Sequence, residues 1–263
     1  MEAMLSLAPD ERLDHVNEQV TLIQKKNGLT YGSDAFLLSA FVRAQRHACA
    51  VDLGSGTGII PLLLLARDKI ACAYAAELQP GFVDLIGRNA VINQMQHRLT
   101  PLEVDVRTLR AADLHRESVD IVTANPPYMT VDAGERNRDD EKYMARHEVA
   151  GGVADFCSCA ARLLRSGGSF YCVWRPDRIS DLLRGLVANR LEPKRMAFVH
   201  ADENSEPSVV LIEARAGGAP YCRMLPPLLL HEPQSRGLSH RPLTARAQQI
   251  YDTMQWYDTK EGT

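Results

Sequence analysis

The stretch that decides the fold covers residues 51–60 and reads Val51-Asp52-Leu53-Gly54-Ser55-Gly56-Thr57-Gly58-Ile59-Ile60. The short apolar run over residues 48–53 is typical of a buried strand that ends at a turn. The apolar residues after the third glycine, over 59–65, predict a helix. A strand, a glycine-rich turn and a helix form half of a nucleotide-binding βαβ unit, in which a ligand lies against bare backbone.

The spacing of the glycines distinguishes between possible ligands. Gly54, Gly56 and Gly58 form G-x-G-x-G, whereas dinucleotide-binding proteins, including nicotinamide oxidoreductases, use G-x-G-x-x-G. Asp52 places a carboxylate where a pyrophosphate would be repelled but a ligand carrying an amine and a sulfonium would be tolerated. The stretch resembles the first motif of class I methyltransferases, which bind S-adenosylmethionine. That resemblance implies that Asp52 and the three glycines belong to the cofactor site.

Acids also follow the next two predicted strands. Glu77 ends the strand predicted over residues 70–76 and follows the glycines by roughly 20 residues, the spacing at which an acid binds ribose hydroxyls. Leu78 can then cover a face of the adenine ring. After a third strand, Asp105 can accept the adenine amine, and the backbone N–H of Val106 can meet a ring nitrogen. Ser33 or Asp34 caps the helix predicted over residues 35–44, and Asp34 is ambiguous because it can cap the helix, face the cofactor or do both.

A second chemical motif, Asn125-Pro126-Pro127-Tyr128, follows the strand predicted over residues 118–124. The two prolines fix the backbone and remove two N–H donors, so the Asn125 side chain and the carbonyls are the dominant polar groups. Asn125 and the Pro126 carbonyl can each accept one N–H of a planar amine, while Tyr128 can stack on the target base. We expect this motif to face the glycine turn across the point where the strand order reverses. The chemistry needs no metal and no covalent enzyme intermediate.

Alternating strands and helices predict an α/β fold of the Rossmann-like class I methyltransferase type. We expect a doubly wound, mostly parallel, seven-stranded sheet that ends in an antiparallel hairpin. The seven strands are predicted at residues 48–53, 70–76, 99–104, 118–124, 169–174, 193–199 and 208–214. Residues 1–263 are interpreted as one domain, with an N-terminal arm and hairpin over 1–32 and a C-terminal extension over 217–263.

Two details of these end segments can be tested against the structure. The hairpin is expected to pair residues 20–26 with residues 29–31 around a tip at Lys25-Lys26-Asn27-Gly28. Residues 1–15 are expected to form a mobile arm. In the extension, residues 245–256 predict a helix laid on the surface.

Composition restricts the class of protein further. The net charge of −3 means that no overall positive field attracts nucleic acid, so any RNA contact must come from local basic patches. The six cysteines form no C-x-x-C pair, which indicates reduced thiols and no zinc. The N-terminus lacks a signal-peptide core, and the apolar run over residues 60–65 is far shorter than the ~20 residues that span a bilayer. We therefore expect a cytoplasmic protein without a membrane partner.

A longer pattern resembles the bacterial tRNA adenine-N6 methyltransferases that modify the adenosine beside the anticodon of a valine tRNA. It extends over most of the chain, roughly from Leu13 to Tyr251. Besides the two motifs above it includes Gln24-Lys25, Asp34-Ala35-Phe36-Leu37-Leu38, Ala145-Arg146-His147-Glu148, Trp174-Arg175-Pro176, Glu192-Pro193-Lys194-Arg195 and Leu225-Pro226-Pro227-Leu228. The resemblance implies S-adenosylmethionine as the cofactor, S-adenosylhomocysteine as the product and tRNA as the substrate.

The catalytic motif alone leaves other substrates open. A glutamine N5-methyltransferase acting on a protein such as a release factor would use the same four residues. Those relatives usually carry a helical substrate domain before the sheet, and only about 45 residues precede the first predicted sheet strand here. An rRNA base N-methyltransferase and a catalytically silent RNA-binding module are further alternatives.

Basic residues that fit an RNA substrate are scattered along the chain. If they surround one mouth, they can bind phosphates, and binding should weaken with salt at a log–log slope on the order of −0.7 per single-strand phosphate. The candidates are Lys25, Lys26, Arg136, Arg138, Arg146, His147, Arg175, Arg178, Lys194 and Arg195. The sequence is compatible with a monomer or a homodimer.

Overall fold

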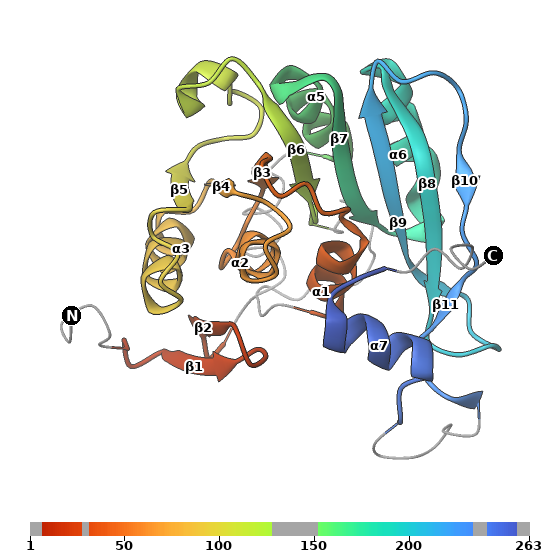
Figure 1. The fold of residues 1–263 in the computed structure, drawn as a ribbon, viewed down its shortest axis with the longest axis horizontal. Helices are drawn as coiled ribbons and strands as arrows, with labels where there is room; N and C mark the ends of the chain where they lie inside the picture. The colour runs from red at the N-terminus through yellow and green to blue at the C-terminus, as the bar shows by residue number, and fades with distance from the viewer. Residues whose placement is uncertain (1–6, 28–31, 128–151, 234–240, 257–263) are drawn as a thin grey trace, which may run out of the picture.

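A central mixed β-sheet organises the chain (Figure 1). The computed structural model describes residues 7–27, 32–127, 152–233 and 241–256. Within them, nine strands join in the order β10-β8-β9-β7-β6-β3-β4-β5, with β11 also paired to β8. The strands are β3 (Cys49–Leu53), β4 (Cys72–Glu77), β5 (Leu99–Glu103), β6 (Val119–Ala124), β7 (Leu164–Trp174), β8 (Leu191–His200), β9 (Pro207–Ala216), β10 (Arg223–Met224) and β11 (Leu228–Leu229).

The predicted fold class is confirmed by this sheet. Strands β5, β4, β3, β6 and β7 run parallel, and β9 is antiparallel to both β7 and β8. The seven expected strands form the body of the sheet, and the two-residue strands β10 and β11 extend the edge beside β8. Strand β7 begins at Leu164, before the expected residue 169. The added segment includes Gly167, which adopts a positive φ of 76°.

Strand β3 lies where the direction of the winding reverses. All five of its residues are buried, as the continuous apolar run predicts for a parallel strand covered on both faces. Leu53 pairs with Ala76 of β4 on one side and with Ala124 of β6 on the other. The chain passes outward through β4 and β5 and then crosses to β6, so the loops after β3 and β6 open onto one crevice.

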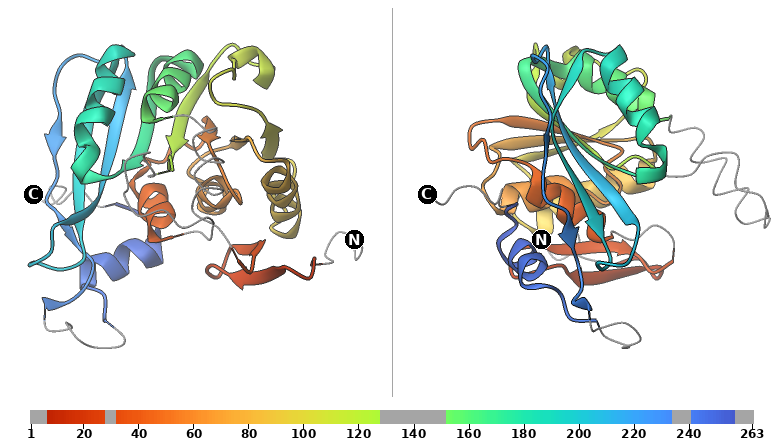
Figure 2. Two further views of the ribbon diagram at one scale, coloured as in Figure 1. Left: turned by 180° about the vertical axis from the view of Figure 1, so that it is seen from behind. Right: turned by 90° about the vertical axis from the view of Figure 1, so that its right-hand side faces the viewer.

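Helices cover both faces of the sheet (Figure 2). They are α1 (Ser33–Phe41), α2 (Ile59–Ala66), α3 (Pro80–Ile92), α5 (Val153–Leu163), α6 (Ile179–Ala188) and α7 (Ala245–Thr253), with 3-10 turns η2 (Ala111–Leu114) and η3 (Pro176–Arg178). One apolar core joins α1, α2, α3 and α7 to the sheet, and a second joins α5 and α6 to the opposite face. The sheet is therefore buried between two helical layers, and its carboxyl edge is left for the loops.

The N-terminal hairpin differs from the prediction. Strand β2 (Thr21–Lys25) pairs with β1 (Glu11–His15), which lies in the segment expected to be a mobile arm. The turn between these two strands is stabilised by Asn17. Its side-chain oxygen accepts hydrogen bonds from the backbone N–H groups of Gln19 and Val20, both at 2.9 Å. The expected partner strand, residues 29–31, lies outside the described residues, as does Gly28 of the expected tip.

The start of the first predicted helix also needs correction. Gly32 is the N-cap residue of α1, without a side-chain cap, so Ser33 and Asp34 lie in the first turn instead of capping the helix. Helix α7 lies on the surface as expected, with only Ala247 and Ile250 buried, and it ends at Thr253 instead of residue 256. Just after its end, the Trp256 ring lies edge-on to Phe41 at a centroid distance of 5.3 Å, and the backbone N–H of Trp256 donates to the Ala40 carbonyl at 3.1 Å.

Candidate active site

A cavity of about 200 Å³ lies at the carboxyl edge of the sheet, where the sequence predicts the site. It brings together most of the predicted cofactor and catalytic residues: Gly54, Gly56, Glu77, Leu78, Asp105, Val106, Asn125 and Pro127. Asp34, Asp52, Gly58 and Pro126 are not among the lining residues. Tyr128 lies outside the described residues, so its stacking role stays a prediction.

The glycine turn takes a shape that its sequence requires. Gly54, Gly56 and Gly58 have φ values of 66°, 56° and 82°, in the left-handed region that side chains with a Cβ rarely adopt. The N–H groups of Gly54 and Ser55 donate to the Ala76 carbonyl at 2.9 and 3.1 Å, which holds the turn against β4. A Cβ added at Gly56 would have no atom within 4 Å, so open space for a ligand lies beside this residue.

Asp52 lies behind the glycine turn and not in the cavity. Its side chain is 1% exposed, and its two oxygens accept hydrogen bonds from the Ser55 and Thr123 hydroxyls, both at 2.6 Å. It thus connects the turn to β6. Burial raises the pKa of this carboxyl to about 7, and the nearby Glu77 adds to the rise. The assignment of Asp52 to the cofactor site stays a prediction.

We expect Asp52 to make folding stability fall as pH rises from about 4 to about 7. The pKa is near 3.8 when unfolded and about 7 when folded, so the folded state binds the extra proton in this window and ionisation above it costs stability. An asparagine at this position carries no such charge, so Asp52→Asn should reduce the fall by up to about 4 kcal/mol. Thermal melts across pH measure this. The exposed Asp68→Asn variant is the control, and an unchanged pH profile for Asp52→Asn would contradict the prediction.

Glu77 connects the start of α3 to the glycine turn, and its binding of a ribose stays a prediction. One carboxylate oxygen accepts from the N–H groups of Leu78 and Gln79 at 2.9 and 3.0 Å, at the start of α3. The other accepts from the Gly56 N–H at 2.9 Å and so holds the middle of the glycine turn. A carboxylate has about four acceptor positions, which leaves capacity for a ribose hydroxyl in the cavity.

Asp105 and Val106, which follow β5, also line the cavity. The Arg107 guanidinium holds the pKa of Asp105 below its usual range and donates to both carboxylate oxygens, with Nε at 3.0 and 2.9 Å. The Val106 carbonyl accepts from Arg162 at 2.8 Å, which fixes the backbone where a planar base would lie. This pair is therefore held in place before any ligand binds.

Asn125 and Pro127 line the same cavity as the glycine turn. Because Leu53 and Ala124 are register partners, Gly54 and Asn125 leave the sheet from adjacent positions. Phe156 of α5 also lines the cavity, and its ring would lie 3.3 Å from a Cβ added at Gly54. The sequence pattern did not single out Phe156, whose spacing in α5 is that of an ordinary core residue.

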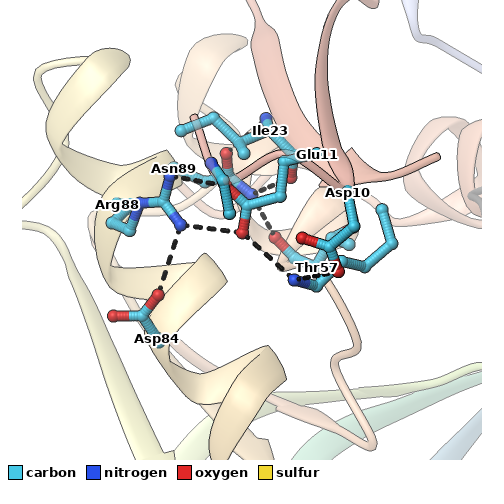
Figure 3. Close-up of polar contacts among 9 residues, drawn as sticks. Asp10, Glu11, Ile23, Thr57, Asp84, Arg88 and Asn89 are labelled. Atoms are coloured by element: carbon cyan, nitrogen blue, oxygen red, sulfur yellow. Dashed lines mark hydrogen bonds and ion pairs between the residues drawn. The ribbon is translucent and has the colours of Figure 1, made fainter. Parts of the chain in front are cut away.

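The N-terminal hairpin is joined to the glycine turn through Asn89 of α3, a residue that the sequence pattern also did not reveal (Figure 3). The fully buried Asn89 amide accepts from the Ile23 N–H at 2.7 Å and donates to the Ile23 and Thr57 carbonyls at 3.1 and 2.9 Å. Glu11 of β1 forms a bidentate ion pair with Arg88, in which the two guanidinium nitrogens lie 3.0 and 2.8 Å from the two carboxylate oxygens. The hairpin therefore supports the turn from behind.

The predicted RNA-contacting residues lie in different environments. Lys25 pairs with Asp10 and Glu11, Lys26 donates to the Pro9 carbonyl, and Lys194 donates to the Ala219 carbonyl. Arg175 and Arg178 are partly exposed and pair with Asp177 and Asp181. Arg136, Arg138, Arg146 and His147 lie outside the described residues.

Arg195 is the one basic candidate that the structure removes. Its side chain is 4% exposed, forms an ion pair with the buried Glu213, and donates to the Phe41 carbonyl at 2.8 Å. The antiparallel register places Arg195 opposite Glu213, so the guanidinium points into the protein. The expectation that Arg195 borders the same RNA-binding mouth as the other residues is therefore wrong.

The polar and apolar groups that line the cavity fit the nucleoside end of S-adenosylmethionine. Glu77 offers an acceptor for ribose, Asp105 one for an adenine amine, and Leu78 and Phe82 add apolar surface for a planar ring. Together with a sheet of this order, the site is that of the S-adenosylmethionine-dependent methyltransferases, and the chain is an enzyme of that class. Residues 25–190 match the model of the methyltransferase small domain, and the chain belongs to this family.

Several curated relatives share one name, tRNA1(Val) (adenine(37)-N6)-methyltransferase. The protein from Aeromonas hydrophila is 30% identical over 138 residues, which are 52% of this chain and 56% of that protein. The protein from Porphyromonas gingivalis strain W83 is 25% identical over 203 residues, 75% of this chain and 79% of that protein. The chain thus spans little more than half of the first relative and about four fifths of the second.

Solved structures show the same fold at lower identity. A predicted O-methyltransferase from Agrobacterium tumefaciens has a TM-score of 0.68 at 21% identity, covering 85% of this chain and 98% of that one. M. jannaschii TYW2 in complex with AdoMet has a TM-score of 0.54 at 13% identity, covering 81% of this chain and 89% of that one. Among the described residues, no group of acids, histidines or cysteines could hold a metal ion. None of the helices in the described ranges is long and apolar enough to cross a membrane.

Proposed function

We propose that this enzyme methylates the N6 amine of an adenine in tRNA, beside the anticodon. The observation that carries the proposal is that Asn125 and Pro127 line the same cavity as Gly54, Gly56 and Glu77. The methyl donor and a planar nitrogen acceptor can therefore meet in one crevice. The shared name of the curated relatives supports tRNA as the substrate. A tRNA substrate also agrees with a cytoplasmic location.

The chain's residues would act by binding and orienting the reactants. S-adenosylmethionine, when bound, supplies an electrophilic methyl group on a sulfonium. Glu77 and Asp105 would hold the nucleoside end. The Asn125 side-chain oxygen and the Pro126 carbonyl would each accept a hydrogen bond from one N–H of the target amine and direct its lone pair toward the methyl group. Such positioning is worth roughly 7–11 kcal/mol of the barrier.

The substrate assignment is tested with purified full-length enzyme, labelled methyl donor and three separate acceptors: unmodified tRNA, rRNA and a translation release factor. We expect label in tRNA, recovered as N6-methyladenosine after digestion to nucleosides, and none with an Asn125→Ala enzyme. Label in a glutamine of the release factor or in rRNA, without label in tRNA, would contradict the proposal. So would label in none of the three while the enzyme still binds S-adenosylmethionine.

A further inference from the structure

Helix α3 packs directly against the glycine turn through two residues that lie on one face of the helix. Ile86 and Asn89 are three positions apart, and both are fully buried. The Ile86 side chain would lie 3.4 Å from a Cβ added at Gly58. The Asn89 amide donates to the Thr57 carbonyl at 2.9 Å (Figure 3). The turn is therefore in contact with one apolar and one polar side chain of α3.

The Thr57 carbonyl needs a donor from a side chain. Thr57 lines the cavity between Gly56 and Gly58 and is only 5% exposed. If α2 extended back to Thr57, this carbonyl would accept the N–H of residue 61, but that residue is Pro61, which has none. A buried carbonyl without a donor is costly, so Asn89 stabilises the turn in the conformation that directs this carbonyl toward α3.

The same side of α3 also holds the outer edge of β2. Asn89 accepts from the Ile23 N–H at 2.7 Å and donates to the Ile23 carbonyl at 3.1 Å. Asn93, which follows the last residue of α3, does the same for Thr21, at 2.9 and 2.7 Å. The two asparagines differ in their other N–H. That of Asn89 donates to the glycine turn, whereas that of Asn93 donates to the Asn89 backbone carbonyl at 2.7 Å.

The middle of the glycine turn is thus held by two side chains. Glu77 accepts from the Gly56 N–H at 2.9 Å, and Asn89 donates to the next carbonyl along the chain, that of Thr57. Glycine loses more conformational freedom than any other residue when it is fixed, so a turn that is already fixed binds a ligand at a smaller entropic cost.

We propose that Asn89 is a positioning residue for the methyl donor. By fixing the Thr57 carbonyl, it holds the glycine turn in the shape that binds S-adenosylmethionine, and it links that shape to the N-terminal hairpin. The inference rests on the cofactor lying against the glycine turn. It does not depend on which acceptor is methylated.

The test compares Asn89→Ala with Asn93→Ala, because both variants remove a donor and an acceptor from β2 but only the first also removes the donor to Thr57. In calorimetric titrations we expect S-adenosylmethionine to bind roughly 10-fold more weakly to Asn89→Ala, the size of one lost buried hydrogen bond, and within about 2-fold of wild type to Asn93→Ala. With tRNA as acceptor, the KM for S-adenosylmethionine should rise by the same factor in Asn89→Ala while kcat stays unchanged. Equal cofactor affinity in the two variants, whether weakened or wild type, would overturn the inference.

A second measurement uses the wild-type enzyme, so it applies even if Asn89→Ala does not fold. Amide hydrogen exchange is followed by NMR at Ile23 and Thr21 with and without S-adenosylmethionine. Because coupling between two sites is reciprocal, the cofactor should slow exchange of the Ile23 N–H by roughly 10-fold and change that of the Thr21 N–H far less. Equal slowing at both residues, or at neither, would contradict a link through Asn89.

Glu77→Gln distinguishes failure of this inference from failure of the site itself. If Asn89→Ala and Glu77→Gln both keep wild-type affinity for S-adenosylmethionine, the cofactor does not lie against the glycine turn, and the assignment of the site fails together with this inference. If only Asn89→Ala keeps wild-type affinity, this inference alone is wrong. The titration and the exchange measurement contain no tRNA, so they decide the role of Asn89 even if tRNA is not the substrate.

Discussion

Replacing Asn125 by alanine is expected to lower methylation at least ~100-fold and to leave the affinity for S-adenosylmethionine nearly unchanged. The loss of one preorganised polar group aimed at the reacting atoms has effects of this size. Asn125 lines the cavity just after β6, beside the strand end that leads into the glycine turn. Its amide would orient the target amine, and alanine offers no acceptor there. The reaction should therefore lose rate and not cofactor binding.

The measurement is a single-turnover methylation rate at saturating cofactor and tRNA, together with a calorimetric titration of S-adenosylmethionine. Asn204→Ala, in the loop between β8 and β9 and outside the cavity, is the matched control. Activity of Asn125→Ala within a few-fold of wild type would show that Asn125 does not orient the acceptor. A parallel loss of cofactor affinity would instead place Asn125 on the cofactor side of the crevice.

Replacing Glu77 by glutamine is expected to weaken S-adenosylmethionine binding roughly 10- to 100-fold, the usual contribution of a hydrogen bond to a charged group. The substitution removes the charge that would accept a ribose hydroxyl. It also affects the turn, because the carboxylate accepts three backbone N–H groups and an amide can offer only one oxygen to them. The Gly56 N–H or the start of α3 would then face an N–H₂ group.

Glu103→Gln is the matched control for this prediction, because Glu103 is the register partner of Glu77 on β5 but is exposed and lies outside the cavity. Calorimetric titration measures the cofactor affinity of both variants. The KM for S-adenosylmethionine should rise far more than kcat falls in Glu77→Gln. If Glu77→Gln lowers the melting temperature but keeps wild-type cofactor affinity, Glu77 stabilises the start of α3 and does not bind the cofactor.

Much of the fold could be predicted from local pattern. A parallel strand buried on both faces must be apolar along its length, and a turn with positive φ needs glycine, so residues 51–60 indicate a strand, turn and helix without further context. Polar residues that follow such strands, like Glu77 and Asn125, must meet at one edge of the sheet. These physical requirements are local. They explain why the predicted sheet and the predicted location of the crevice agree with the structure.

What could not be predicted depends on partners distant in the sequence. Strand β1 reads Glu-Arg-Leu-Asp-His, which has no strand-like periodicity, and it is held by the contacts of Glu11 with Arg88 and by backbone pairing with β2. Asp52 follows the family pattern but faces Ser55 and Thr123, because the backbone of the turn directs it behind the loop. Arg195 is one residue from the partly exposed Lys194, but it lies just after an irregularity in the β8–β9 register, opposite Glu213, and is buried.

By itself, the sequence determined the class of fold, the order of its strands along the chain and the edge at which the chemistry lies, because these follow from burial and backbone conformation over a few consecutive residues. The tertiary structure alone decided which charges are buried and how Asn89 joins the hairpin to the glycine turn. It alone also brought Arg46, Lys69, Arg195 and Trp256 together around a second cavity, from four segments whose proximity depends on packing across the whole molecule.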